Sequence, residues 1–154
     1  MRLLLSVAVA DIHVGGYAKN FRTYAGHLGA NAMDAHSCRR GDSWRWNGVV
    51  FSYLSPVSQA VGESLGGMRG SQNSRNSQSC VLKATLGEAA VLLTGDIERA
   101  EEASLALRYQ EQLRATVMVA PHHGSKTSSS YALLKRVDPE IVIVAAGYKK
   151  FVRT

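Results

Sequence analysis

The sequence predicts a layered α/β sandwich, and three observations support this fold class. Short apolar runs that suit strands alternate with amphipathic stretches that suit helices, one hairpin is visible, and no repeat or heptad pattern appears. A length of 154 residues suits one compact domain, and 45% hydrophobic against 19% charged residues allows a buried core. No run reaches the roughly 18 apolar residues of a membrane-spanning helix, so we expect the chain as given to be soluble.

The first two predicted elements lie near the amino terminus. Residues 3–10 form an apolar run that resembles a short signal peptide, but it stops at Asp11 and equally suits a buried strand. We favour the strand. Residues 17–29 carry apolar side chains at spacings of three and four before a glycine, which predicts an amphipathic helix.

The middle of the chain reads as strand, loop and hairpin. Residues 49–54 predict a strand that Pro56 closes, and residues 57–79 are rich in Gly, Ser, Gln and Asn, which predicts a long flexible loop. Two strands over 80–85 and 89–94 follow, joined by a short turn that contains glycine.

Helices and strands alternate in the last third of the chain. Asp96 is a candidate N-cap for a helix that runs to about Leu113. Residues 116–120 predict a strand, residues 131–137 a helix behind a serine-rich cap, and residues 141–145 a further strand. The predicted inner face of the first of these helices consists of Ile97, Ala100, Leu105 and Leu107.

Charge and cysteine content leave alternatives open. The 18 basic and 12 acidic residues give a net charge of +6, which favours polyanions as neighbours but also occurs in ordinary basic domains. Cys38 and Cys80 form no CxxC pair, which excludes a zinc knuckle. They form either one disulfide in an oxidising compartment or two buried thiols in a reducing one.

Two segments place polar residues directly after apolar strands. Asp96 follows the strand end Leu92-Leu93-Thr94 and a glycine, a position that suits a metal ligand as well as a helix cap. His122 and His123 follow the next strand in the sequence Pro-His-His-Gly-Ser. Neutral imidazole is a common ligand for zinc, manganese or iron, although two loop histidines beside a serine cap would need no metal. On an extended backbone, only one of the two adjacent histidines would face the site.

Two further features have a structural and a functional interpretation. Trp44 and Trp46 flank Arg45 and suit stacking on bases, but we favour one ring in the core and one at an interface. Ser125 and Lys126 precede a helix and suit phosphate binding, while ordinary capping explains them equally well.

Together, these segments resemble the metallo-β-lactamase superfamily. More narrowly, they are similar to the carboxy-terminal domain of ComEC-type DNA-internalisation competence proteins. The resemblance covers about residues 36–148. Its motifs are Cys38-Arg39-Arg40-Gly41, Trp44 to Val49, Asn76 with Ser79 to Leu82, Leu92 to Glu98, Val119 to Ser125, Thr127 to Ser130 and Ala145-Gly147-Tyr148.

The resemblance implies an αββα sandwich with a binuclear metal site at its mouth, where a metal-bound hydroxide attacks a phosphodiester. It implies His13, Asp96, His122 and His123 as metal ligands, with Asp96 and His123 catalytic and with Ser125 and Lys126 contacting the substrate. The implied cofactor is zinc or manganese, with no organic cofactor. The implied partners are incoming single-stranded DNA and the membrane channel portion of a parent protein in the bacterial inner membrane.

The sequence departs from the family pattern at several metal positions. Aligned on Gly15-Gly16, the expected ligands of the main motif fall on Ala8, Ala10 and Ile12, and only His13 remains. Ser55 occupies a further histidine position. We therefore expect one partial metallo-β-lactamase-like domain over residues 1–154, incomplete at its N-terminal edge. The alternative is a catalytically inactive remnant with a structural or DNA-contacting role.

Overall fold

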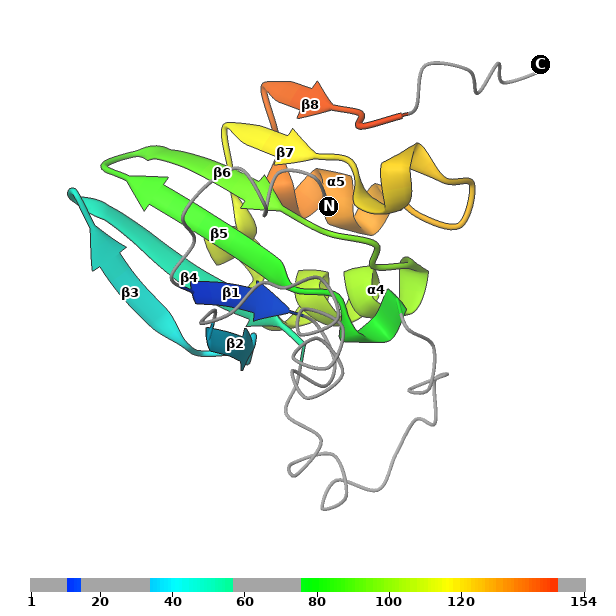
Figure 1. Cartoon of the computed structure of the whole chain (residues 1–154). Helices are drawn as coiled ribbons and strands as arrows, with labels where there is room; N and C mark the ends of the chain where they lie inside the picture. Colours follow the sequence, from blue (N-terminus) through cyan, green and yellow to red (C-terminus); the bar gives the residue numbers. More distant parts are fainter. Residues whose placement is uncertain (1–10, 15–33, 57–75, 147–154) are drawn as a thin grey trace.

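The computed structural model describes residues 11–14, 34–56 and 76–146, and Figure 1 shows their arrangement. The strand predicted over 3–10, the helix predicted over 17–29 and most of the loop predicted over 57–79 lie outside these residues.

The described residues form a six-stranded sheet and a separate two-stranded one. In the larger sheet, β3 to β6 pair antiparallel in sequence order, and β6, β7 and β8 pair parallel. Its strands, in spatial order, are β3 (Ser43–Trp46), β4 (Val49–Ser55), β5 (Val81–Leu86), β6 (Ala89–Leu93), β7 (Val117–Val119) and β8 (Ile141–Ile143). The smaller sheet pairs β1 (Asp11–Val14) with β2 (Asp34–Ser37) in parallel.

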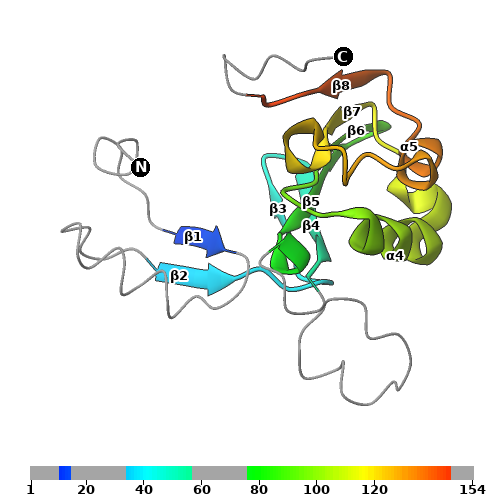
Figure 2. The same ribbon diagram turned by 90° about the vertical axis from the view of Figure 1, so that its right-hand side faces the viewer.

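Two α-helices cover one face of the six-stranded sheet, and the β1–β2 pair lies on its opposite side (Figures 1 and 2). They are α4 (Arg99–Tyr109) and α5 (Tyr131–Val137). Three short 3-10 turns accompany them: η1 (Asn76–Gln78), η2 (Gln110–Leu113) and η3 (Pro121–Gly124). Within the described ranges, no helix combines the length and hydrophobicity needed to cross a membrane.

The hydrophobic core lies between these helices and the sheet. Strand β6 shows how the sequence selects the face, because Ala90 and Leu92 are buried while Val91 and Leu93, which alternate with them, stay exposed. Burial of one such leucine side chain contributes about 2 kcal/mol. The fully buried apolar side chains of this cluster are Val81, Leu92, Leu113, Met118, Leu133, Val137 and Ile97.

Several predicted elements are confirmed. The hairpin forms from β5 and β6, the strand that Pro56 closes is β4, and α5 spans Tyr131–Val137 behind its N-cap Ser130. The mixed α/β class is confirmed as well. Cys38 and Cys80 form a disulfide, which decides between the two alternatives that the sequence leaves open.

The predicted start of α4 is wrong, and its predicted inner face is right for Ile97 and Leu105, which are buried, but wrong for Ala100 and Leu107. The helix begins at Arg99, and its N-cap is Glu98, which exchanges hydrogen bonds with Glu101 in a capping box. Asp96 lies two residues too early to cap it. The buried residues of the helix are Glu102, Leu105 and Ala106, whereas Leu107 is 79% exposed and Ala100 is also exposed.

Candidate functional site

The candidate site lies where two neighbouring parallel strands end. Asp96 follows β6 and the two histidines follow β7, so the parallel pairing brings their segments to the same edge of the sheet. The Thr94 hydroxyl, fully buried, donates to the Val119 carbonyl at 2.7 Å, and the His122 amide donates to the Gly95 carbonyl at 3.0 Å. These two bonds fix the strand ends against each other.

The histidine segment is not extended, so the expectation that only one ring faces the site is wrong. His122 and His123 both adopt left-handed backbone conformations, with φ of 48° and 56°. Gly124 follows with φ of 74°, and a Cβ there would meet Val144 Cγ1 at 3.1 Å. Non-glycine residues with positive φ are uncommon, and consecutive ones occur where surrounding contacts hold them.

This tight turn directs both imidazole rings toward acidic side chains. His123 Nε2 lies 3.4 Å from Asp96 Oδ1, and His122 Nδ1 lies 3.5 Å from Glu98 Oε1. The first pair is about half exposed and the second about one-third exposed. The site therefore consists of two partly exposed imidazole–carboxylate pairs.

The hydrogen bonds around His123 constrain its protonation. His123 Nδ1 lies 3.0 Å from the Ala145 carbonyl oxygen, which can only accept, so Nδ1 must carry a proton. In the neutral ring, Nε2 then presents a lone pair to the Asp96 carboxylate, which is also an acceptor. This contact is favourable only when a cation or a second proton lies at Nε2.

His122 has a related unsatisfied atom. Its Nδ1 is buried and has no hydrogen-bond partner in the described part of the chain. The Glu98 oxygen at 3.5 Å is too distant for a hydrogen bond and already accepts from Asn76 Nδ2 at 2.8 Å. A buried nitrogen in this state is costly unless a further ligand or proton satisfies it.

His13, the remaining ligand implied by the family resemblance, makes ring contacts instead. Its ring stacks on Trp44 at a centroid distance of 5.5 Å and contacts His36 and Tyr53. Across residues 11–14, 34–56 and 76–146, no group of three or more His, Cys, Asp or Glu side chains is arranged to hold a metal ion. The described site thus consists of the two pairs alone.

Ser125 and Lys126 lie in the loop that leads to α5. The Ser125 hydroxyl bonds with the Thr127 hydroxyl at 3.2 Å and accepts from its amide at 3.4 Å. The Lys126 carbonyl accepts from the Arg99 guanidinium at 3.2 Å, and its side chain is exposed. The Ser125 side chain thus bonds within the loop, and the residue that caps α5 is Ser130.

The expectation that one tryptophan is buried is also wrong. Trp44 is 37% exposed and Trp46 is 67% exposed, because β3 is the edge strand of the sheet and every residue in it is exposed. Trp44 stacks on Phe51 of β4, its cross-strand neighbour, at 5.1 Å. The two tryptophans and His13 form an exposed aromatic surface on the antiparallel side.

Sequence reasoning gave no role in the site to four residues that support it, although Asn76, Ser79 and Glu98 lie in the motifs of the family resemblance. Glu98 pairs with His122, Asn76 holds Glu98, Ser79 bonds to Asp96, and the buried Glu102 accepts from the amides of Ser129 and Ser130 at 2.6 and 2.7 Å. The Glu-x-x-Glu spacing of Glu98 and Glu101 indicated a capping box and would have located the helix start. The other three contacts arise from tertiary structure.

Comparison with known proteins identifies the family. No family model matches the chain. The competence protein ComA of Neisseria gonorrhoeae is 38% identical over 150 residues, which is 96% of this chain and 20% of ComA. Recombination protein 2 of Haemophilus influenzae is 33% identical over 131 residues, 85% of this chain and 13% of its own length. The chain belongs to the ComEC-type competence family.

A third relative is the uncharacterized protein YcaI of Escherichia coli, 39% identical over 110 residues, which is 71% of this chain and 13% of YcaI. The chain thus spans only 13 to 20% of the lengths of these three relatives. Membership of the ComEC-type family confirms the resemblance found in the sequence motifs. The metallo-β-lactamase fold and the metal site stay predictions.

Proposed function

We propose that this chain is a metallo-β-lactamase-like domain of a DNA-uptake competence protein. In this proposal, the site at the ends of β6 and β7 uses a divalent metal to hydrolyse phosphodiesters of incoming single-stranded DNA. The observation that carries it is the pairing of His123 Nε2 with Asp96 Oδ1 at 3.4 Å, while His123 Nδ1 lies 3.0 Å from the Ala145 carbonyl oxygen.

The geometry and chemistry of this pair fit a metal. In tetrahedral zinc sites, bonds of about 2.0–2.2 Å to nitrogen and oxygen place two ligand atoms about 3.4 Å apart. Metal-bound histidines commonly donate their other ring N–H to a carbonyl, as His123 Nδ1 does to Ala145. Imidazole and carboxylate together suit zinc or manganese. Asp96 and His123 would therefore hold the metal, and solvent or substrate would complete its coordination.

The fold is compatible with this assignment. Ligands of open α/β sheets bind beyond the carboxyl ends of parallel strands, which is where the two pairs lie. A sheet with helices on one face, and with β1–β2 on the other side, is what one half of an αββα sandwich would contribute (Figure 2).

The residues around the pair suit a phosphodiester. A divalent metal would polarise the phosphate and activate water for attack. His122, with its unsatisfied Nδ1 beside Glu98, is placed to accept or donate a proton. The exposed Lys126 and the Ser125 loop would contact phosphate oxygens. The relatives are much longer chains, and we propose that the remainder of such a protein forms a membrane channel from which this domain receives the strand.

The test compares metal binding and cleavage in matched variants. We expect the purified chain to bind Mn²⁺ in titration calorimetry and to cleave single-stranded DNA when Mn²⁺ is present. Asp96→Ala should weaken Mn²⁺ binding by at least about tenfold and abolish cleavage, since ligand-shell changes have effects of this size or more. Glu88→Ala, at the exposed turn before β6, is the control and should match wild type. Equal cleavage by Asp96→Ala and wild type would contradict the proposal.

A second candidate is a catalytically inactive remnant that contacts DNA, and the aromatic surface favours it. Trp46 is exposed, Trp44 on the same strand stacks with His13, and exposed Trp rings bind single-stranded bases. If this candidate holds, an oligothymidine should quench tryptophan fluorescence without metal, and Trp46→Ala should weaken binding about tenfold. Leu107→Ala, at an exposed apolar position on α4, is its control. Oligonucleotide binding without Mn²⁺ binding would select this candidate over the hydrolase.

A further inference from the structure

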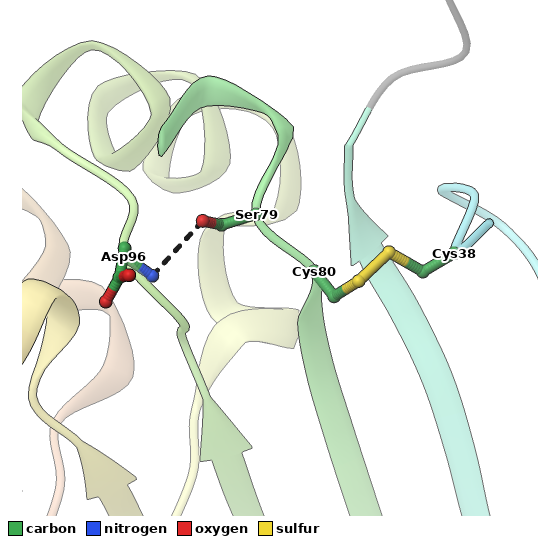
Figure 3. Close-up of a disulfide and its surroundings, with 4 residues drawn as sticks. All are labelled: Cys38, Ser79, Cys80 and Asp96. Carbon is green, nitrogen blue, oxygen red and sulfur yellow. Dashed lines mark hydrogen bonds between the residues drawn. A yellow bond between two sulfur atoms is a disulfide. The ribbon is translucent and has the colours of Figure 1, made fainter. Parts of the chain in front are cut away.

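The segment Asn76–Cys80 contacts both acidic residues of the site, Asp96 and Glu98. Asn76 Nδ2 donates to Glu98 Oε1 at 2.8 Å, and the Ser79 hydroxyl accepts from the Asp96 amide at 3.2 Å. In Figure 3, the Asp96 carboxylate points away from Ser79, so the backbone of Asp96 is held while its side chain stays available. One short segment thus contacts each acid by a separate hydrogen bond.

The segment also packs tightly on the turn that carries Asp96. A Cβ on Gly95 would lie 3.1 Å from the Cys80 carbonyl oxygen and 3.2 Å from Ser79 Cβ. Gly95 has φ of +60°, so glycine is required here both by its conformation and by the close approach of the backbone. Displacement of the segment would therefore be transmitted directly to the Asp96 turn.

A covalent bond fixes the end of the segment. Cys80 is joined to Cys38, whose side chain is buried and lies just beyond β2 (Figure 3). The Cα atoms of the two cysteines are 5.9 Å apart. Ser79 is the direct neighbour of Cys80, so the disulfide limits how far the Ser79 hydroxyl can move from the Asp96 amide.

We propose that Asn76 and Ser79 are positioning residues for the acidic side of the site, and that the Cys38–Cys80 disulfide sets their place. This inference rests on the proposed function for its consequences, which are metal affinity for Ser79 and the rate of cleavage for Asn76. Asn76 determines which oxygen of Glu98 faces His122, and Ser79 determines where the Asp96 backbone lies relative to His123. Residues that orient ligands in this way typically change metal affinity about 10- to 100-fold when removed.

The experiment measures Mn²⁺ affinity, Mn²⁺-dependent cleavage and amide hydrogen exchange in the oxidised chain. We expect Ser79→Ala to weaken Mn²⁺ binding about tenfold and to accelerate exchange of the Asp96 amide, which loses its acceptor. Ser79→Thr keeps the hydroxyl oxygen and should restore both. Asn76→Ala releases Glu98, which faces His122 and not the proposed metal ligands, so it should slow Mn²⁺-dependent cleavage without weakening Mn²⁺ binding or accelerating exchange of the Asp96 amide. Gln78→Ala is the control, because among the described residues Gln78 makes no hydrogen bond to Asp96 or Glu98.

The disulfide is tested separately. The double variant Cys38→Ala/Cys80→Ala leaves no thiol that could itself bind Mn²⁺, and we expect it to accelerate Asp96 amide exchange while circular dichroism shows the fold retained. If that variant unfolds, the comparison of Ser79→Ala with Ser79→Thr decides the inference. Unchanged exchange and affinity in Ser79→Ala would overturn it. If wild type binds no Mn²⁺, the proposed function fails, whereas the exchange comparison still decides the positioning role.

Discussion

The parallel and antiparallel sides of the six-stranded sheet are stabilised in different ways. On the parallel side, α4 and α5 cover β6 and β7, and Leu92 and Met118 are fully buried. On the antiparallel side, β3 is exposed along its whole length, and its aromatic rings stack on the surface. The edge strand of the parallel side, β8, is exposed as well, and Val81 of the antiparallel side is fully buried in the same core. The antiparallel side differs because the disulfide and main-chain hydrogen bonds such as Gly41 to Tyr53 also support it.

This difference indicates why the imidazole–carboxylate pairs lie at the parallel side. Two adjacent left-handed histidines need surroundings that hold them, and a packed core supplies these. The antiparallel side presents Trp44 and Trp46 on an edge strand, which suits contact with a partner more than catalysis. Changes on the two sides should therefore have separable effects.

The largest effect is expected from loss of the Cys38–Cys80 disulfide. By loop-closure entropy, a bridge across 42 residues stabilises the folded chain by about 4 kcal/mol. Urea unfolding of the oxidised chain and of Cys38→Ala/Cys80→Ala should show this difference. Exchange should accelerate more in β4 and β5, which adjoin the disulfide, than in β7. Uniform acceleration in all strands would mean that the two sides unfold as one unit.

The second effect compares core truncations on the two sides. Leu92→Ala removes a fully buried side chain beneath the helices and should lower the free energy of unfolding by about 3 kcal/mol. Phe51→Ala, which removes a partly exposed ring that stacks on Trp44, should cost less than half as much. Denaturant titrations of both variants measure this. Equal losses would show that the aromatic stack is as important to stability as the helix-backed core.

Local signals explain which parts of the fold could be predicted. The β5–β6 hairpin alternates strand residues around a glycine turn, and α5 follows a serine cap, so both were visible in the sequence. The histidine conformations were not visible, because they depend on the His122–Gly95 hydrogen bond and on packing of Gly124 against Val144.

The candidate site was predicted in part for the same reason. Asp96, His122 and His123 follow strands, and the parallel pairing of β6 with β7 places them at one edge. Glu98 was overlooked because the expected helix cap was Asp96, and the contact of Glu98 with His122 arises only in the tertiary structure. Trp44 was expected in a core or an interface, and nothing in the sequence showed that its strand is at the edge of the sheet.

The third effect concerns Glu102, whose buried carboxylate joins α4 to the loop before α5. It accepts from the Ser129 and Ser130 amides, and Glu102→Gln would turn one acceptor into a donor that faces an N–H. We expect a loss of about 2 kcal/mol in the free energy of unfolding. Glu140→Gln, at an exposed position, is the control and should change stability by less than about 0.5 kcal/mol. A similar loss in both variants would mean that the carboxylate at 102 has no special role.

The smallest effect concerns Tyr109, whose hydroxyl connects the two sides by donating to the Leu54 carbonyl at 3.2 Å. Burial raises the pKa of Tyr109 above its ordinary value of 10.0, with Arg40 and Arg108 opposing the shift. Because the folded pKa lies above the unfolded one, this tyrosine stabilises the chain fully below pH 10, and the contribution falls as pH rises through the folded pKa. Tyr109→Phe should cost about 1 kcal/mol at pH 7.

The pH dependence of this difference isolates Tyr109 from other groups that titrate in the same range. Burial also raises the pKa of Tyr53 and lowers that of Lys83, and these two act in opposite directions as pH rises. Both are present in wild type and in Tyr109→Phe, so their contributions cancel when the two unfolding curves are subtracted. The stability gap should therefore narrow between pH 9 and pH 11, since only wild type loses a phenol proton from position 109. A gap that stays constant over this range would show that folding does not raise the pKa of Tyr109.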